Sequence, residues 1–133
     1  KPYDNMIDSR LENYLEAKVA AGLGDNEKAS HLLTAIVQHK ASRSNFESAN
    51  LLSALALREL GKTQEADSMA SAWSKDFPEN RIAQWCTAIY KGENEKAASM
   101  LQVRDEQTDS APWEASFRDS NFDLIVRLFS NAR

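Results

Sequence analysis

The chain has 133 residues, of which 42% are hydrophobic and 27% charged, as in a globular protein large enough for one core. Its net charge is −4 and its basic residues are scattered, which argues against a nucleic-acid partner. With 4 Gly and 3 Pro it has few turn residues for an all-β fold, and no apolar run approaches the ~20 residues of a membrane span. The chain starts with Lys1 rather than Met, so we expect a piece of a longer protein, and its compartment is not identified.

Apolar residues recur every three or four positions along most of the chain, which is typical of amphipathic helices. In chain order, the pattern predicts helices at about 6–23, 26–40, 45–60, 64–76, 79–91, 94–103, 111–117 and 121–130. Asp25 and Thr63 are suitable N-caps, and Ser44 to Glu47 and Ser120 to Asp123 match the capping box. Pro78 ends the helix before it, because proline cannot continue a helix interior. We therefore predict an all-α fold.

Three short stretches of the sequence are near copies of one another. They are Gly24-Asp-Asn-Glu-Lys-Ala29, Gly61-Lys-Thr-Gln-Glu-Ala66 and Gly92-Glu-Asn-Glu-Lys-Ala97. Their first residues are 37 and then 31 positions apart, a period that is typical of stacked helical hairpins. These three glycines and Gly22 follow apolar-periodic segments, as expected of helix C-caps. Stacked hairpins present a binding surface rather than an active site.

This signature resembles the tetratricopeptide repeat (TPR) family, which pairs two antiparallel helices in a unit of about 34 residues. In that family an alanine lets the second helix pack closely on the first, and Ala29, Ala66 and Ala97 match it. The proline that ends a unit is matched by Pro78. Trp85 departs from the pattern, since that position usually carries a small residue, so the third hairpin must pack differently.

The resemblance implies a right-handed α-α superhelix that forms a single domain over residues 1–133. Its parts would be three TPR-like hairpins and one or two C-terminal capping helices, at about 6–40, 45–77, 79–103 and 111–131.

Proteins of this family bind partners along a concave side that is lined by the first helix of each hairpin. The resemblance places an apolar groove with two cations there, lined by Leu11, Tyr14, Lys18, Leu51, Leu55, Arg58, Ile82, Cys86 and Ile89. An exposed apolar patch of this kind marks an interface. Two arrangements remain open: the final helix, Phe122 to Phe129, folds back as a cap, or the groove is open to another polypeptide. Trp113 is the best candidate for an exposed anchor; in the alternative, it staples the tail to the third hairpin.

No residue pattern indicates catalysis, a cofactor or a metal. His31 and His39 are eight positions apart on one predicted helix, so they cannot chelate as an i, i+4 pair would. Cys86 is the one cysteine, which excludes an internal disulfide, and it has no base beside it, so we interpret it as a small buried hydrophobe. There is no glycine-rich phosphate loop.

The leading hypothesis is a non-catalytic scaffold or adaptor for protein–protein or interdomain contact, in which Lys18 and Arg58 select charge at the apolar groove. Its partner would be another protein, the remainder of its own longer chain, or a second copy. The alternative is a C-terminal accessory domain of a larger bacterial enzyme, because the tail from Pro112 to Phe122 is similar to helical ends of large bacterial carbohydrate-processing proteins. A stand-alone enzyme is disfavoured by the lack of a nucleophile, metal set or cofactor loop.

Overall fold

Seven helices make up the part of the chain that the structure describes. The computed structural model describes residues 8–106 and 119–130, and these two ranges contain no strand. The helices are α1 (Arg10–Gly22), α2 (Asn26–Gln38), α3 (Asn50–Glu59), α4 (Thr63–Asp76), α5 (Arg81–Tyr90), α6 (Asn94–Glu106) and α7 (Phe122–Ser130). The predicted all-α class is confirmed. None of these helices has the length and apolar character that a membrane span requires.

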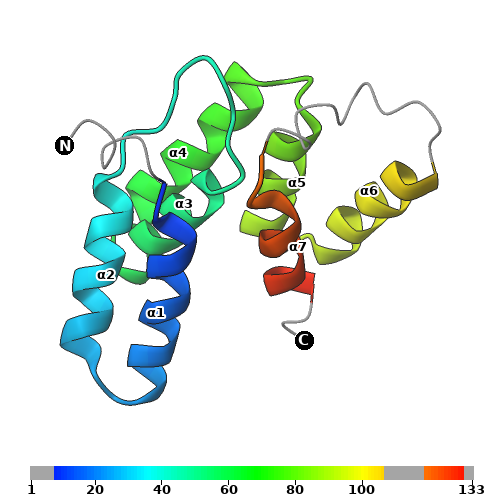
Figure 1. The fold of residues 1–133 in the computed structure, drawn as a ribbon. Helices are drawn as coiled ribbons and strands as arrows, with labels where there is room; N and C mark the ends of the chain where they lie inside the picture. Colours follow the sequence, from blue (N-terminus) through cyan, green and yellow to red (C-terminus); the bar gives the residue numbers. More distant parts are fainter. Residues whose placement is uncertain (1–7, 107–118, 131–133) are drawn as a thin grey trace.

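Successive helices pack as pairs, α1 with α2, α3 with α4 and α5 with α6 (Figure 1). Each pair is joined by a short turn with a glycine in the left-handed region, where φ is 82° at Gly24, 85° at Gly61 and 78° at Gly92. Residues with a Cβ rarely adopt this conformation, so glycine is required for these turns. Gly22 differs, because it is the last residue of α1 and precedes the C-cap Leu23, whereas each of the other three glycines directly follows the C-cap residue of its helix. The prediction that all four glycines are C-caps is therefore wrong for Gly22.

The pairs also contact one another, α2 with α3 and α4 with α5, and the first helices α1, α3 and α5 are neighbours in that order. The alanine after each turn glycine is buried: Ala29 is 7% exposed, Ala66 0% and Ala97 2%. Each second helix can therefore approach its first helix closely. The helices pack against each other as a compact bundle, which is consistent with a helical repeat.

The start of α3 differs from the prediction. α3 begins at Asn50 rather than near residue 45. Ser44 and Asn45 instead donate their backbone N–H groups to Ser42 Oγ at 3.3 and 3.2 Å, which holds a turn in place of the predicted capping box. Phe46, which follows this turn, enters the core and is 5% exposed. The capping-box prediction for this segment is therefore wrong.

Smaller differences occur at three other helix ends. Lys62, not Thr63, holds the N-cap position of α4, and its side chain makes no capping bond. Asn80 caps α5 by accepting a hydrogen bond from the backbone of Ala83 at 3.0 Å, so this helix begins slightly later than expected. α6 continues to Glu106, past the predicted end near residue 103. The helix predicted at about 111–117 lies outside the described residues.

Candidate functional site

The residues predicted to line the groove lie on the neighbouring helices α1, α3 and α5. The apolar ones are largely buried within the chain itself: Leu11, Tyr14, Leu51, Leu55, Ile82 and Cys86 expose between 0% and 5% of their surface. Ile89 is half-buried, and Lys18 and Arg58 are exposed. Most of the predicted groove residues therefore form part of the core of the described chain.

α7 folds back onto α5 and α1. Phe122 meets the Trp85 ring of α5 edge-on, with ring centroids 5.4 Å apart. Phe129 lies against Tyr14 of α1, with centroids 6.3 Å apart. Figure 1 shows α7, coloured orange to red, beside α5. The final helix thus lies against α5 and α1, and Trp85, the departure from the repeat pattern, packs on it.

The two halves of α7 are held unequally. Phe122 is 1% exposed and Ile125 0%, so the N-terminal half is anchored in the core. Val126 and Phe129 are only half-buried, and Leu124 on the outer side is 51% exposed. The C-terminal half therefore rests on the surface of the bundle rather than in it.

Asp119, just before α7, connects this helix to the start of α3. Its Oδ2 accepts the backbone N–H of Ser48 at 2.7 Å, and its Oδ1 accepts the N–H of Asn121 at 3.2 Å. One carboxylate thus accepts hydrogen bonds at the starts of two helices. The N–H groups there have no carbonyl partner within their own helix. Asn121 lies within the capping box predicted for Ser120 to Asp123, but the side chain that accepts its N–H is Asp119, which precedes that box.

Both cations predicted to select a charged partner are engaged within the chain. Lys18 Nζ donates to Glu59 Oε1 at 2.7 Å and lies 5.0 Å from the ring centroid of Tyr14. Burial lowers the pKa of Lys18, but the hydrogen bond and charge of Glu59 and the contact with Tyr14 outweigh it, so the pKa lies above its ordinary value. Arg58 donates to the Tyr90 carbonyl at 3.1 Å and stacks over the Tyr90 ring at 4.7 Å. An acidic partner would have to compete with these contacts.

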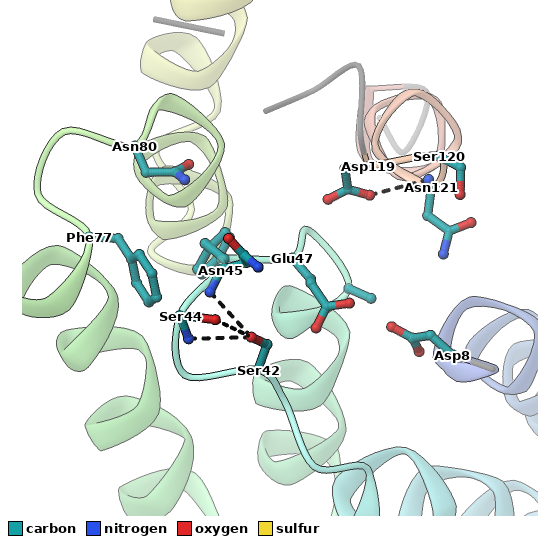
Figure 2. A pocket seen from close by; sticks show the side chains of 12 residues that line it. Asp8, Ser42, Ser44, Asn45, Glu47, Phe77, Asn80, Asp119, Ser120 and Asn121 are labelled. Carbon is teal, nitrogen blue, oxygen red and sulfur yellow. Dashed lines mark hydrogen bonds between the residues drawn. The ribbon is translucent and has the colours of Figure 1, made fainter. Parts of the chain in front are cut away.

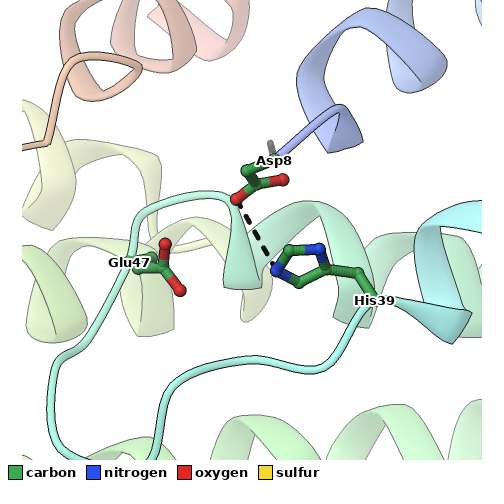
Figure 3. A group of neighbouring side chains, drawn as sticks. All are labelled: Asp8, His39 and Glu47. Atoms are coloured by element: carbon green, nitrogen blue, oxygen red, sulfur yellow. Dashed lines mark ion pairs between the residues drawn. The ribbon is translucent and has the colours of Figure 1, made fainter. Parts of the chain in front are cut away.

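A cluster of titratable groups that the sequence pattern did not predict lies near the start of α1. Asp8, His39 and Glu47 bring possible metal-ligand atoms within 4.8 Å of one another (Figure 3). Arg10, which is 1% exposed, pairs with the same carboxylates: its Nη2 is 2.7 Å from Asp8 Oδ2 and 3.7 Å from Glu47 Oε1. The guanidinium already supplies the positive charge that a metal ion would bring. We therefore interpret the cluster as a structural ion-pair network.

Arg10 also joins α1 to the first turn of α3. Its Nη1 donates to Asn50 Oδ1 at 2.8 Å and to Ser53 Oγ at 2.9 Å. Burial raises the pKa of Asp8, but the hydrogen bonds and charge of Arg10 and the charge of His39 outweigh it, and the pKa lies below its ordinary value. The ionised carboxylate is thus the form that the fold favours.

A polar hollow of about 600 Å³ lies beside this network. Figure 2 shows Asp8, Glu47 and Asp119 on its wall, together with serine and asparagine side chains. Asp8 is held by Arg10 and Asp119 by the backbone of Ser48, so two of the three carboxylates already have structural roles. Among the described residues that line the hollow, there is no histidine or lysine that could act as a base for its serines.

Cys86 is fully buried, as predicted for a small hydrophobe. Its Sγ lies 3.7 Å from the carbonyl oxygen of Ser48, a weak hydrogen bond. Burial raises the pKa of the Cys86 thiol well above its ordinary value, and the charge of Asp119 adds to the effect. A protonated, inaccessible thiol is a poor nucleophile.

The chain matches no protein-family model, no curated protein and no solved structure. Its function is therefore inferred below from the arrangement of its own residues. Trp113, the predicted exposed anchor, lies outside the residues that the structure describes.

Proposed function

We propose that this chain is a TPR-like, non-catalytic interaction module whose face of α1, α3 and α5 binds an apolar segment of another protein, or of the remainder of its own longer chain. The observation that carries the proposal is the position of α7, which seats Phe122 against α5 and Phe129 against α1. A face that accepts one amphipathic helix has the apolar character and shape to accept another.

The order of the helices and the turns between them support the superhelix that the TPR resemblance implies. The first helices α1, α3 and α5 are neighbours in order, and each hairpin turns on a left-handed glycine. The buried Ala29, Ala66 and Ala97 occupy the positions where that family packs its two helices closely. Each of these features is one that the TPR resemblance implies.

An apolar stripe on α1 supports partner contact beside the groove. Leu15 and Val19 of α1 are 44% and 61% exposed, and their four-residue spacing places them along one side of the helix; Leu23, the C-cap residue, is 81% exposed and continues this spacing. Leu15 and Val19 directly follow Tyr14 and Lys18, so the stripe flanks the predicted groove residues of α1. A partner that docks on this side would remove these side chains from water.

Site-specific photo-crosslinking in the source cells tests the proposal. A photoreactive residue at Val19 should give a discrete adduct, whereas one at Lys75, an exposed position on α4, should not. Leu15→Glu should remove the adduct without unfolding the chain, because Leu15 is already exposed. Equal labelling at Val19 and Lys75, or no adduct at Val19, would contradict the proposed function.

The size of the native product distinguishes the two kinds of partner. The chain itself has a mass of 14.9 kDa. A band of that size on an immunoblot of the source cells would indicate a free adaptor. A much larger band would indicate interdomain contact within a longer chain, the accessory-domain alternative.

A further inference from the structure

We infer that α7 is a built-in competitor for the groove, and that the partner is an amphipathic helix that displaces it, with large apolar residues at the spacing of Phe122, Ile125 and Phe129. The inference rests on the proposed function and names the class of partner that the module binds. Positions i, i+3 and i+7 of such a helix would take the places of the three anchors, as in other helix-in-groove complexes.

The contacts of α7 define what the partner must provide. Phe122 and Ile125 are almost completely buried, so the first two anchors must be large and apolar. Asp123 and Arg127 face outward and are exposed, so the positions between the anchors can be polar. Lys18 and Arg58 are already engaged inside the chain, so apolar shape rather than charge selects the helix.

The hold on α7 is weak enough for exchange. α7 has nine residues, and an isolated helix of that length is marginal in water, so its helical state depends on the groove. Its C-terminal half is only half-buried, as the exposure of Val126 and Phe129 shows. The ion pair between Arg104 and Asp123, at 3.7 Å, contributes little, because Asp123 is 79% exposed.

The covalent connection makes α7 a competitor despite this weak hold. A segment on the same chain competes at an effective concentration of roughly millimolar order. An outside helix binds only the fraction of molecules from which α7 has been released, and its apparent affinity falls by that fraction. Weakening α7 should therefore strengthen the binding of an outside helix.

A fluorescein-labelled peptide of residues 119–130, titrated onto the full chain, tests the competition. We expect the peptide to bind the Phe129→Ala chain about tenfold more tightly than the unmodified chain, which corresponds to ~1.4 kcal/mol of lost internal binding. Leu124→Ala is the matched control on the exposed side of α7, and it should leave peptide affinity unchanged. A peptide that carries Phe122→Ala and Ile125→Ala should bind neither chain.

The outcomes separate this inference from the proposed function. Equal peptide binding to the unmodified and Phe129→Ala chains would overturn the competition and leave the proposed function standing. Absence of peptide binding to both chains, with the Val19 photo-adduct retained, would overturn the helical partner but not the module. If circular dichroism shows that Phe129→Ala is unfolded, Val126→Ala, also half-buried on α7, replaces it in the same titration.

Discussion

α3 and α7 are apolar helices of similar length, 10 and 9 residues, but the chain holds them in opposite ways. α3 is surrounded by α1, α2, α4 and α5, and its residues from Asn50 to Leu57 are all buried. α7 has two fully buried side chains on one face, and Leu124 on its other side is largely exposed. A helix buried on every side is part of the frame, whereas a helix buried on one face is bound to that frame as a ligand would be.

Truncation of one leucine in each helix should give the largest contrast. Leu51 of α3 is 0% exposed, so Leu51→Ala should lower the free energy of unfolding by about 2–5 kcal/mol through lost burial and a cavity. Leu124→Ala on α7 should change it by less than about 0.5 kcal/mol, since that side chain is exposed. Urea unfolding monitored by circular dichroism measures both. Similar losses for the two variants would contradict the distinction between frame and ligand.

Native-state hydrogen exchange should separate the two helices without mutation. Amides of α3 should exchange only through global unfolding, because every surrounding helix must move first. Amides of α7 should exchange through local release, at an opening free energy smaller by about 2 kcal/mol or more. The denaturant dependence is the internal control: exchange should vary steeply with denaturant in α3 and weakly in α7. Equal opening free energies in the two helices would show that α7 belongs to the frame.

The third test compares the stability contributions of two cations that bind side chains of α3, the buried Arg10 and the exposed Lys18. Arg10→Ala should cost about 3 kcal/mol, because it leaves the side chains of Asp8, Asn50 and Ser53 without their partner. Lys18→Ala breaks an exposed pair with Glu59 and should cost at most about 1 kcal/mol. Urea unfolding at low and high salt compares them. If Arg10→Ala lowers the free energy of unfolding by less than about 1 kcal/mol, water molecules must hydrogen-bond the former partners of Arg10 in its place, which would contradict the prediction.

The hairpin frame could be predicted because its signals are local. The turn glycines and the alanines that follow them need only a few neighbouring residues to act. The prediction failed at Ser44. The sequence there matches a capping box, but contacts with residues distant in the sequence hold this segment outside α3. Phe46 packs on Trp73 with ring centroids 5.5 Å apart, and Ser48 binds Asp119, which is 71 positions away in the sequence. Such long-range contacts leave no trace in a short sequence window.

The candidate site was predicted in the same uneven way. The TPR resemblance selected the apolar residues of α1, α3 and α5, since it implies that the first helix of each hairpin faces one common side. It did not predict the role of Arg10, whose partners Asn50 and Ser53 are 40 and 43 positions away. It also left open the place of α7, because a strongly apolar helix face requires cover but does not specify which surface supplies it.

The Asp8 carboxylate gives the frame a pH dependence of defined sign. Its pKa is lower in the folded chain than the unfolded value of about 3.9, so its contribution is complete above that value and is lost as the pH falls through the folded pKa. Asp8→Asn should therefore cost about 1–2 kcal/mol at pH 7, where it removes charged hydrogen bonds to Arg10, and the cost should shrink as the pH falls below about 4. Urea midpoints of both chains across this range measure it. A cost that does not change with pH would mean that Asp8 acts through its shape alone.

Two glycines of the frame provide the smallest and most specific test. An added Cβ meets no atom within 4 Å at Gly61 or at Gly22, so only backbone conformation distinguishes the two sites. Gly61→Ala should cost about 1 kcal/mol, because its φ of 85° is strained for alanine. Gly22→Ala should stabilise the chain by about 0.5 kcal/mol, because Gly22 lies in α1 and alanine favours the helix. Thermal unfolding gives the sign of each change. Neither variant should alter the expected tenfold difference in peptide affinity between the unmodified and Phe129→Ala chains, because both glycines lie in the hairpins and outside α7.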